Sequence, residues 1–163
     1  MSISKHTLIA LVEDKPGVLA RVASLFRRRG FNIESIAVGR SEQPGLSRIT
    51  LVVGGDSAEV EQVRKQLDKL INVVRVSDIT KEEIVARELA LIKVKATAST
   101  KSEIIQIVDI FRANIVDVAS DSLTVEVTGD EDKVNSLFEL LRSFGIKEIS
   151  RTGRIALTRG GVS

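Results

Sequence analysis

Apolar and polar residues follow two periods along this chain, one typical of strands and one of helices, in a regular order. Residues 7–12 are almost wholly apolar, which predicts a strand buried on both faces. The next segment carries apolar residues at helical spacing, and Arg27 to Arg29 followed by Gly30 are typical of a helix C-terminus. The apolar positions of this predicted helix are Val18, Leu19, Val22, Ala23, Leu25 and Phe26.

The rest of the first half predicts a hairpin, a second helix and a closing strand. Pro44 and Gly45 fit the middle of the hairpin turn, and Asp56 or Ser57 is suited to cap the helix. The predicted segments are strands 32–40 and 46–53, a helix with apolar positions Val60, Val63, Leu67 and Leu70, and a strand 72–79. The order is therefore βαββαβ.

The second half repeats this order. Thr100 to Glu103 has the pattern of a capping box at the start of a helix, and Asp130 starts another helix. The predicted strands are 88–96, 114–118, 123–128 and 146–151. We predict an α+β protein with two ferredoxin-like βαββαβ domains in tandem, at 1–79 and 88–163, joined by a polar, helix-prone linker at 80–87.

The junction between the first strand and the first helix has chemistry that the second half lacks. Pro16 and Gly17 fall in the first turn predicted for this helix, where proline is tolerated and glycine lets a ligand approach the backbone. The amides of Val18 and Leu19 would bind a carboxylate, and Asp14 would attract an ammonium group. These groups fit an α-amino acid. A simpler interpretation, with Asp14 as N-cap and Pro16 and Gly17 as helix-start residues, fits equally well.

Composition excludes several classes of function. The 163 residues carry 24 Lys and Arg against 22 Asp and Glu, which gives no basic surface for nucleic acid. All aromatic residues are Phe, cysteine is absent, and no apolar run is long enough to span a membrane. We expect a cytoplasmic protein that binds neither nucleic acid nor membranes.

Catalytic and metal sites have little support in the sequence. His6 is the single histidine, and no serine or carboxylate is spaced to form an identifiable triad with it. The carboxylates that remain as metal ligands are scattered along predicted helix starts, and no phosphate-binding loop is present. We therefore expect no catalytic residue and no metal site in this chain.

Three segments carry a resemblance to a known family. The stretches "LVEDKPGVLARVASLFRRRGFNIESIAVG", "GLSRITLVVGGD" and "RELALIKVKA" resemble the regulatory small subunit of acetolactate synthase, also called acetohydroxyacid synthase. The resemblance covers essentially the whole chain and implies that the first domain is an ACT domain, an amino-acid-sensing module. It implies a non-catalytic chain that activates a catalytic large subunit and confers feedback inhibition by valine or a related branched-chain amino acid. Thiamine diphosphate, Mg and FAD would be bound by the large subunit, with no cofactor in this chain.

The resemblance also implies where the effector binds. In this family two ACT domains pair side by side, and the effector lies at their interface. The implied residues are Asp14, Lys15, Pro16, Gly17, Val18 and Leu19 of one protomer, with Asn32 and Ile33 of the other. Many relatives have asparagine where Asp14 stands, which leaves open how the ammonium is held. A self-standing amino-acid-binding regulator of another enzyme is the alternative.

Homodimer formation has a physical argument of its own. Both faces of the strand 7–12 are apolar, and two helices cover one face of a four-stranded sheet. Something must cover the other face, and we expect a second protomer at the sheet edge with another surface, such as the catalytic subunit, on the open face.

Overall fold

The computed structural model describes residues 4–160, which form two compact units. The first unit comprises the chain up to Val85 together with the stretch that starts at Arg154, and the second is Ala86–Gly153. Residues 154–160 pack with the first unit, so the predicted second domain at 88–163 is too long at its C-terminal end. Each unit is described by itself.

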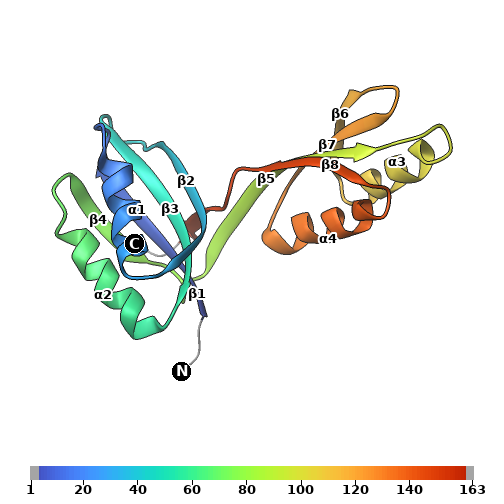
Figure 1. Cartoon of the computed structure of the whole chain (residues 1–163). Helices are drawn as coiled ribbons and strands as arrows, with labels where there is room; N and C mark the ends of the chain where they lie inside the picture. Colours follow the sequence, from blue (N-terminus) through green and yellow to red (C-terminus); the bar gives the residue numbers. More distant parts are fainter. Residues whose placement is uncertain (1–3, 161–163) are drawn as a thin grey trace. The chain divides into compact units, whose positions relative to one another are not determined.

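The first unit has the predicted βαββαβ order (Figure 1). Its strands form one antiparallel sheet in the order β2-β3-β1-β4. The elements are β1 (Ser4–Glu13), α1 (Val18–Arg28), β2 (Asn32–Arg40), β3 (Leu46–Gly55), α2 (Ser57–Asp68) and β4 (Val73–Asp78).

The core of this unit lies between the two helices and one face of the sheet. Phe26 and Val22 of α1 and Leu67 of α2 are fully buried against Leu8 and Leu51 of the central strands. Each buried side chain of this size contributes about 1.5–3 kcal/mol to stability. Most of the apolar positions predicted for α1 therefore serve this packing, but Leu19 stays 42% exposed at its N-terminal end.

Local signals place most of the turns and caps of the first unit correctly. Gly30 has a φ of +76° directly after the C-cap residue of α1, as predicted for a C′ glycine. Gly45 has a φ of +79° in the turn between β2 and β3, and Asp56 accepts a hydrogen bond from the amide of Ala58 as the N-cap of α2.

The sheet face away from the helices is covered in part by the C-terminal segment, which the sequence did not predict. The Arg154 side chain donates to Thr7 Oγ1 at 3.1 Å, and Arg48 Nη2 donates to the carbonyl of Ala156 at 2.8 Å. Ala156 lies in β9 (Ile155–Thr158) and is 4% exposed, while Ile9 and Leu11 on this face are each 8% exposed. The same chain thus supplies part of the cover that sequence analysis assigned to partners.

The second unit repeats the plan of the first. Its sheet order is β6-β7-β5-β8, and α3 and α4 bury Ile104, Leu137 and Leu141 against it. The elements are β5 (Ile84–Lys95), α3 (Lys101–Ile110), β6 (Asn114–Val118), β7 (Ser122–Gly129), α4 (Glu131–Arg142) and β8 (Ile146–Arg151). Asp130 caps α4 by accepting a hydrogen bond from the amide of Lys133 at 2.8 Å.

Two local predictions are wrong, one for the segment before β5 and one for the start of α3. Residues from Ile84 onward belong to β5, so the helix-prone linker is a short turn that leads into a strand. The capping box at Thr100 does not form, because the Thr100 hydroxyl accepts a hydrogen bond from the Thr97 amide instead. Hydroxyl groups often bond to the nearby backbone in this way and lose their capping role.

Candidate functional site

The turn between β1 and α1 has a different geometry from the one predicted. Helix α1 begins at Val18, so Pro16 and Gly17 precede it and do not lie in its first turn. Gly17 is the N-cap residue with a φ of +83°, a conformation that side chains with a Cβ rarely adopt. A Cβ built on Gly17 would contact only Arg21 Nη1, at 3.7 Å. Backbone conformation therefore requires this glycine, and the space beside it is open.

No side chain caps the N-terminus of α1. Asp14 does not act as the N-cap, and the first turn has no acidic residue. Within residues 4–160 the amides of Leu19 and Ala20 donate no hydrogen bond, whereas the Val18 amide donates to the carbonyl of Lys15 at 3.4 Å. The backbone amides available to an anion are thus those of Leu19 and Ala20, whereas the sequence predicted those of Val18 and Leu19.

A polar network that sequence analysis missed surrounds this turn. Asn72, which precedes β4, donates to Glu13 Oε2 at 3.1 Å and accepts from Arg21 Nη2 at 2.9 Å. Lys15 Nζ lies 2.9 Å from the same Glu13 oxygen. The hydrogen bonds from Lys15 and Asn72 lower the pKa of the Glu13 carboxyl, which keeps it charged. The sequence signal for Asn72 was an asparagine at a helix-to-strand turn, and it adopts a φ of +72°.

The network gives the helix N-terminus a defined charge environment. Asn72 holds the Arg21 guanidinium beside Gly17, the residue that directly precedes α1. A guanidinium and two amides form a place for a carboxylate. Asp14 is exposed, and its carboxylate makes no hydrogen bond or ion pair within residues 4–160, so it is available for a cation.

The remaining predicted site residues lie at the opposite end of the sheet. Glu13 pairs with Leu46 at one end of β3, whereas Asn32 pairs with Gly54 at the other. These two ends are roughly 25 Å apart at the rise of a strand. Asn32 is exposed, and the side chain of Ile33 packs against the core of its own unit. One copy of the chain therefore does not bring Asn32 to the α1 N-terminus.

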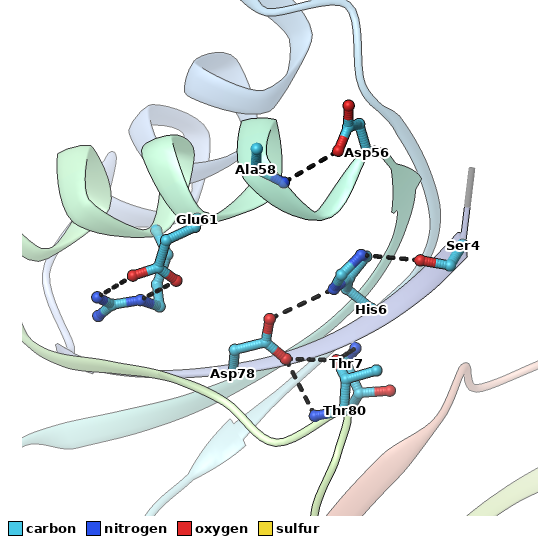
Figure 2. A network of polar contacts seen from close by, with 9 residues as sticks. Ser4, His6, Thr7, Asp56, Ala58, Glu61, Asp78 and Thr80 are labelled. Carbon is cyan, nitrogen blue, oxygen red and sulfur yellow. Dashed lines mark hydrogen bonds and ion pairs between the residues drawn. The ribbon is translucent and has the colours of Figure 1, made fainter. Parts of the chain in front are cut away.

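His6 has neighbours that the sequence did not reveal. His6 Nε2 lies 3.1 Å from Ser4 Oγ, and Nδ1 lies 3.3 Å from Asp78 Oδ2 (Figure 2). Asp78 also accepts hydrogen bonds from the amide and the hydroxyl of Thr80, whose Oγ1 accepts from the Thr7 amide. Ser4 and Asp78 thus contact the two ring nitrogens of His6, although their spacing in the sequence did not identify them as its partners. The chain of bonds joins the start of β1 to the end of β4, which is a structural role.

Other candidate chemistry is sparse in the described part of the chain. Residues 4–160 contain no group of three or more His, Asp or Glu side chains arranged to hold a metal ion. None of the helices described for these residues is long and apolar enough to cross a membrane. The β1–α1 turn is therefore the candidate site with the clearest chemical character.

Comparisons with known proteins match both halves of the chain. Residues 8–75 match the family described as the AHAS small subunit-like ACT domain, and residues 87–160 match the small subunit of acetolactate synthase. The probable acetolactate synthase small subunit of Archaeoglobus fulgidus is 60% identical over 156 residues, which cover 96% of this chain and 98% of that one. The acetolactate synthase small subunit of Mycobacterium bovis is 54% identical over 160 residues, covering 98% and 95%.

A solved structure agrees with these sequence matches. The crystal structure of the acetolactate synthase small subunit from Thermotoga maritima superposes with a TM-score of 0.89 and 46% sequence identity. It covers 98% of this chain and 99% of that chain. Both halves, their order and the fold agree across these comparisons, and the chain therefore belongs to the acetolactate synthase small-subunit family.

Proposed function

We propose that this chain is the non-catalytic regulatory subunit of an acetolactate synthase. It binds the catalytic large subunit, raises its activity and makes it sensitive to feedback by valine or a related branched-chain amino acid. Thiamine diphosphate, Mg and FAD belong to the large subunit in this proposal. The observation that carries it is the uncapped N-terminus of α1, where the amides of Leu19 and Ala20 are free and the Arg21 guanidinium lies beside the N-cap residue Gly17.

The effector site requires two copies of the chain. Strand β2 is an edge of the first sheet, and its side chains Ile36 and Val38 are 36% and 49% exposed. Antiparallel pairing of two β2 edges would set the Asn32 end of one copy beside the Arg40 end of the other. Arg40 pairs with Ser47 near the β2–β3 turn, and the carbonyl of Gly45 in that turn binds the Asp14 amide. A homodimer of this kind brings Asn32 toward the partner's β1–α1 turn.

Each end of an amino acid has a partner in this arrangement. The carboxylate accepts hydrogen bonds from the amides of Leu19 and Ala20, and the charge of Arg21 favours it further. The ammonium is held by the carboxylate of Asp14. Asn32 of the second copy supplies amide hydrogen bonds to either end. The aliphatic side chain of the effector contacts the exposed part of Leu19, which explains an apolar residue at that place.

Reconstitution with the large subunit tests this function. Acetolactate formation is measured with the large subunit alone and after addition of this chain, in the presence of valine, leucine or isoleucine. We expect the added chain to raise the rate and at least one of the three amino acids to lower it again. A chain that binds an amino acid but leaves the large subunit unaffected would indicate a regulator of another enzyme and would contradict the proposal.

A further inference from the structure

A cavity lies on the face of the first sheet that the helices leave uncovered. Its volume is about 320 Å³, which is at the lower end of the range for small-molecule sites. Its apolar part is formed by Ile9 and Leu11 of β1 together with Ile79, all of which are buried. The remaining lining residues are polar or charged: Glu42, Arg48, Arg75, Ser77, Glu82 and Thr158.

Two arginines flank this apolar floor in one row across the sheet. Leu11 pairs with Arg48 on β3 and with Arg75 on β4, so all three side chains leave the same face. Strands β3 and β4 lie on either side of β1 and are therefore about 10 Å apart, a span that the long arginine side chains can bridge from both sides. The Arg75 side chain has no hydrogen bond or ion pair within residues 4–160, and Arg48 is engaged by the carbonyl of Ala156. Two positive charges thus face one hollow without a carboxylate paired to either.

Two glutamates also line this cavity, from other segments. Glu42 comes from the turn between β2 and β3, and Glu82 comes from the turn before β5. Both are exposed, and neither side chain has a hydrogen bond or ion pair in the described part of the chain. Ser77 and Thr158 add hydroxyl groups that can donate or accept hydrogen bonds. The charges are balanced, with two cations and two anions.

This lining matches a small molecule that carries one positive charge, one negative charge and an apolar side chain. A simple anion would satisfy the arginines but would be repelled by the glutamates, and a simple amine would meet the opposite difficulty. We propose that this cavity is a second site for an aliphatic α-amino acid. Its carboxylate binds Arg48 and Arg75, its ammonium faces Glu42 or Glu82, and its side chain lies on Ile9 and Leu11.

The proposed site shares no residue with the β1–α1 turn, and it does not require a second copy of the chain. It does include the C-terminal segment, because Thr158 of β9 is part of the lining. Arg48 links the cavity to β9, because it lines the cavity and also donates a hydrogen bond to the carbonyl of Ala156. A ligand held by Arg48 and Thr158 would therefore stabilise β9 on the sheet. The Arg159 amide, which donates to the carbonyl of Glu83, reports on this contact by hydrogen exchange.

The experiment uses the full chain with the first site disabled. L-leucine, its 2-oxo acid and its decarboxylated amine are titrated by calorimetry into the Asn32→Ala and Gly17→Asp variants, each also combined with Arg75→Gln. Arg28→Gln is the matched control, because Arg28 is an exposed arginine at the end of α1. Circular dichroism verifies that every variant is folded. If only one of the two background variants, Asn32→Ala or Gly17→Asp, is folded, the titrations in that variant suffice for the test.

We expect L-leucine to bind both backgrounds and to slow exchange of the Arg159 amide. Arg75→Gln should weaken this binding at least about tenfold, the effect of losing a hydrogen bond to a charged group, while Arg28→Gln leaves it unchanged. The oxo acid and the amine should each bind more weakly than leucine. Absence of leucine binding in both folded backgrounds, an equal effect of the two arginine variants, or equally tight binding of the oxo acid would overturn the proposal. If the unmodified chain binds leucine in this cavity but leaves acetolactate formation by the large subunit unchanged, the proposed function alone is refuted.

Discussion

Replacing Gly17 separates two reasons for a glycine before α1, namely its positive φ and the space beside it that a ligand carboxylate would occupy. Gly17→Ala adds a methyl group at a φ of +83°, which costs about 1–2 kcal/mol because of backbone strain. The nearest atom to that methyl group would be Arg21 Nη1 at 3.7 Å, an ordinary contact, so no steric overlap adds to the cost. For a chain of this size, 1 kcal/mol corresponds to a fall in Tm of about 2–4 °C. The free amides of Leu19 and Ala20 are left as they are.

Gly17→Asp adds the same strain together with a negative charge. The introduced carboxylate would lie beside the Arg21 guanidinium and the free amides, where the carboxylate of an amino acid is proposed to bind. A ligand that loses one charge-assisted hydrogen bond loses about 1.5–3 kcal/mol of binding free energy, which is roughly 10- to 100-fold in Kd. Valine binding should therefore weaken by at least this much in Gly17→Asp and change little in Gly17→Ala.

Calorimetric titration of valine and thermal unfolding on the same two preparations measure both effects. Wild-type affinity in Gly17→Asp would refute the placement of the ligand carboxylate. An equal loss in both variants would mean that the backbone conformation matters and the charge does not.

Three further predictions concern local interactions. Asp130→Ala should destabilise the second unit by about 1 kcal/mol, because it removes the N-cap of α4. Thr100→Ala should lower the Tm less, because the Thr100 hydroxyl caps no helix amide and the bond to the Thr97 amide that it loses is exposed to solvent. Hydrogen bonds from Lys15 and Arg64 lower the pKa values of the Glu13 and Glu61 carboxyls. The stability that the two charged carboxylates contribute is therefore present above their unfolded pKa of about 4.3 and is lost as the pH falls through their folded pKa values. Glu61→Gln should make stability depend less on pH in acid unfolding curves. Ala156→Asp should lower the Tm and expose β9 to proteolysis, because it places a charge at a buried position, and an unchanged Tm would contradict the role of β9 as a cover.

Periodicity was sufficient for the repeated βαββαβ order, because the helices and the central strands bury regularly spaced apolar side chains in the core of their own unit. The helix 18–28 and the strand pair on either side of Gly45 follow from side-chain spacing and from single turn residues. The docking of β9 did not follow from the pattern, because it depends on long-range bonds from Arg48 and Arg154 to residues far apart in the chain. This packing also means that a fragment ending near Thr80 would lack β9 and would expose more of the apolar face of β1.

An open helix N-terminus after β1 was predictable from the sequence, whereas its free amides and its polar neighbours were not. The segment from Asp14 to Leu19 was identified from the unusual pair Pro16 and Gly17, and the structure has a helix N-terminus there without a cap. The sequence could not reveal which amides are free, because the Val18 amide is used by a local turn bond to Lys15. Nor could it reveal Asn72, whose contribution depends on the close approach of the start of β4 to the end of β1.

The central claim is that one effector site is built from two copies of the chain, and mixing two defective variants tests it directly. Gly17→Asp and Asn32→Ala damage opposite halves of the proposed site, so neither homodimer should bind valine with wild-type affinity. Subunit exchange at equal amounts makes mixed dimers in which one site carries both changes and the other carries none. We predict recovery of about a quarter of the wild-type binding capacity at wild-type Kd, because half of the dimers are mixed and each has one intact site. A mixture that binds no better than its two components would contradict a shared site.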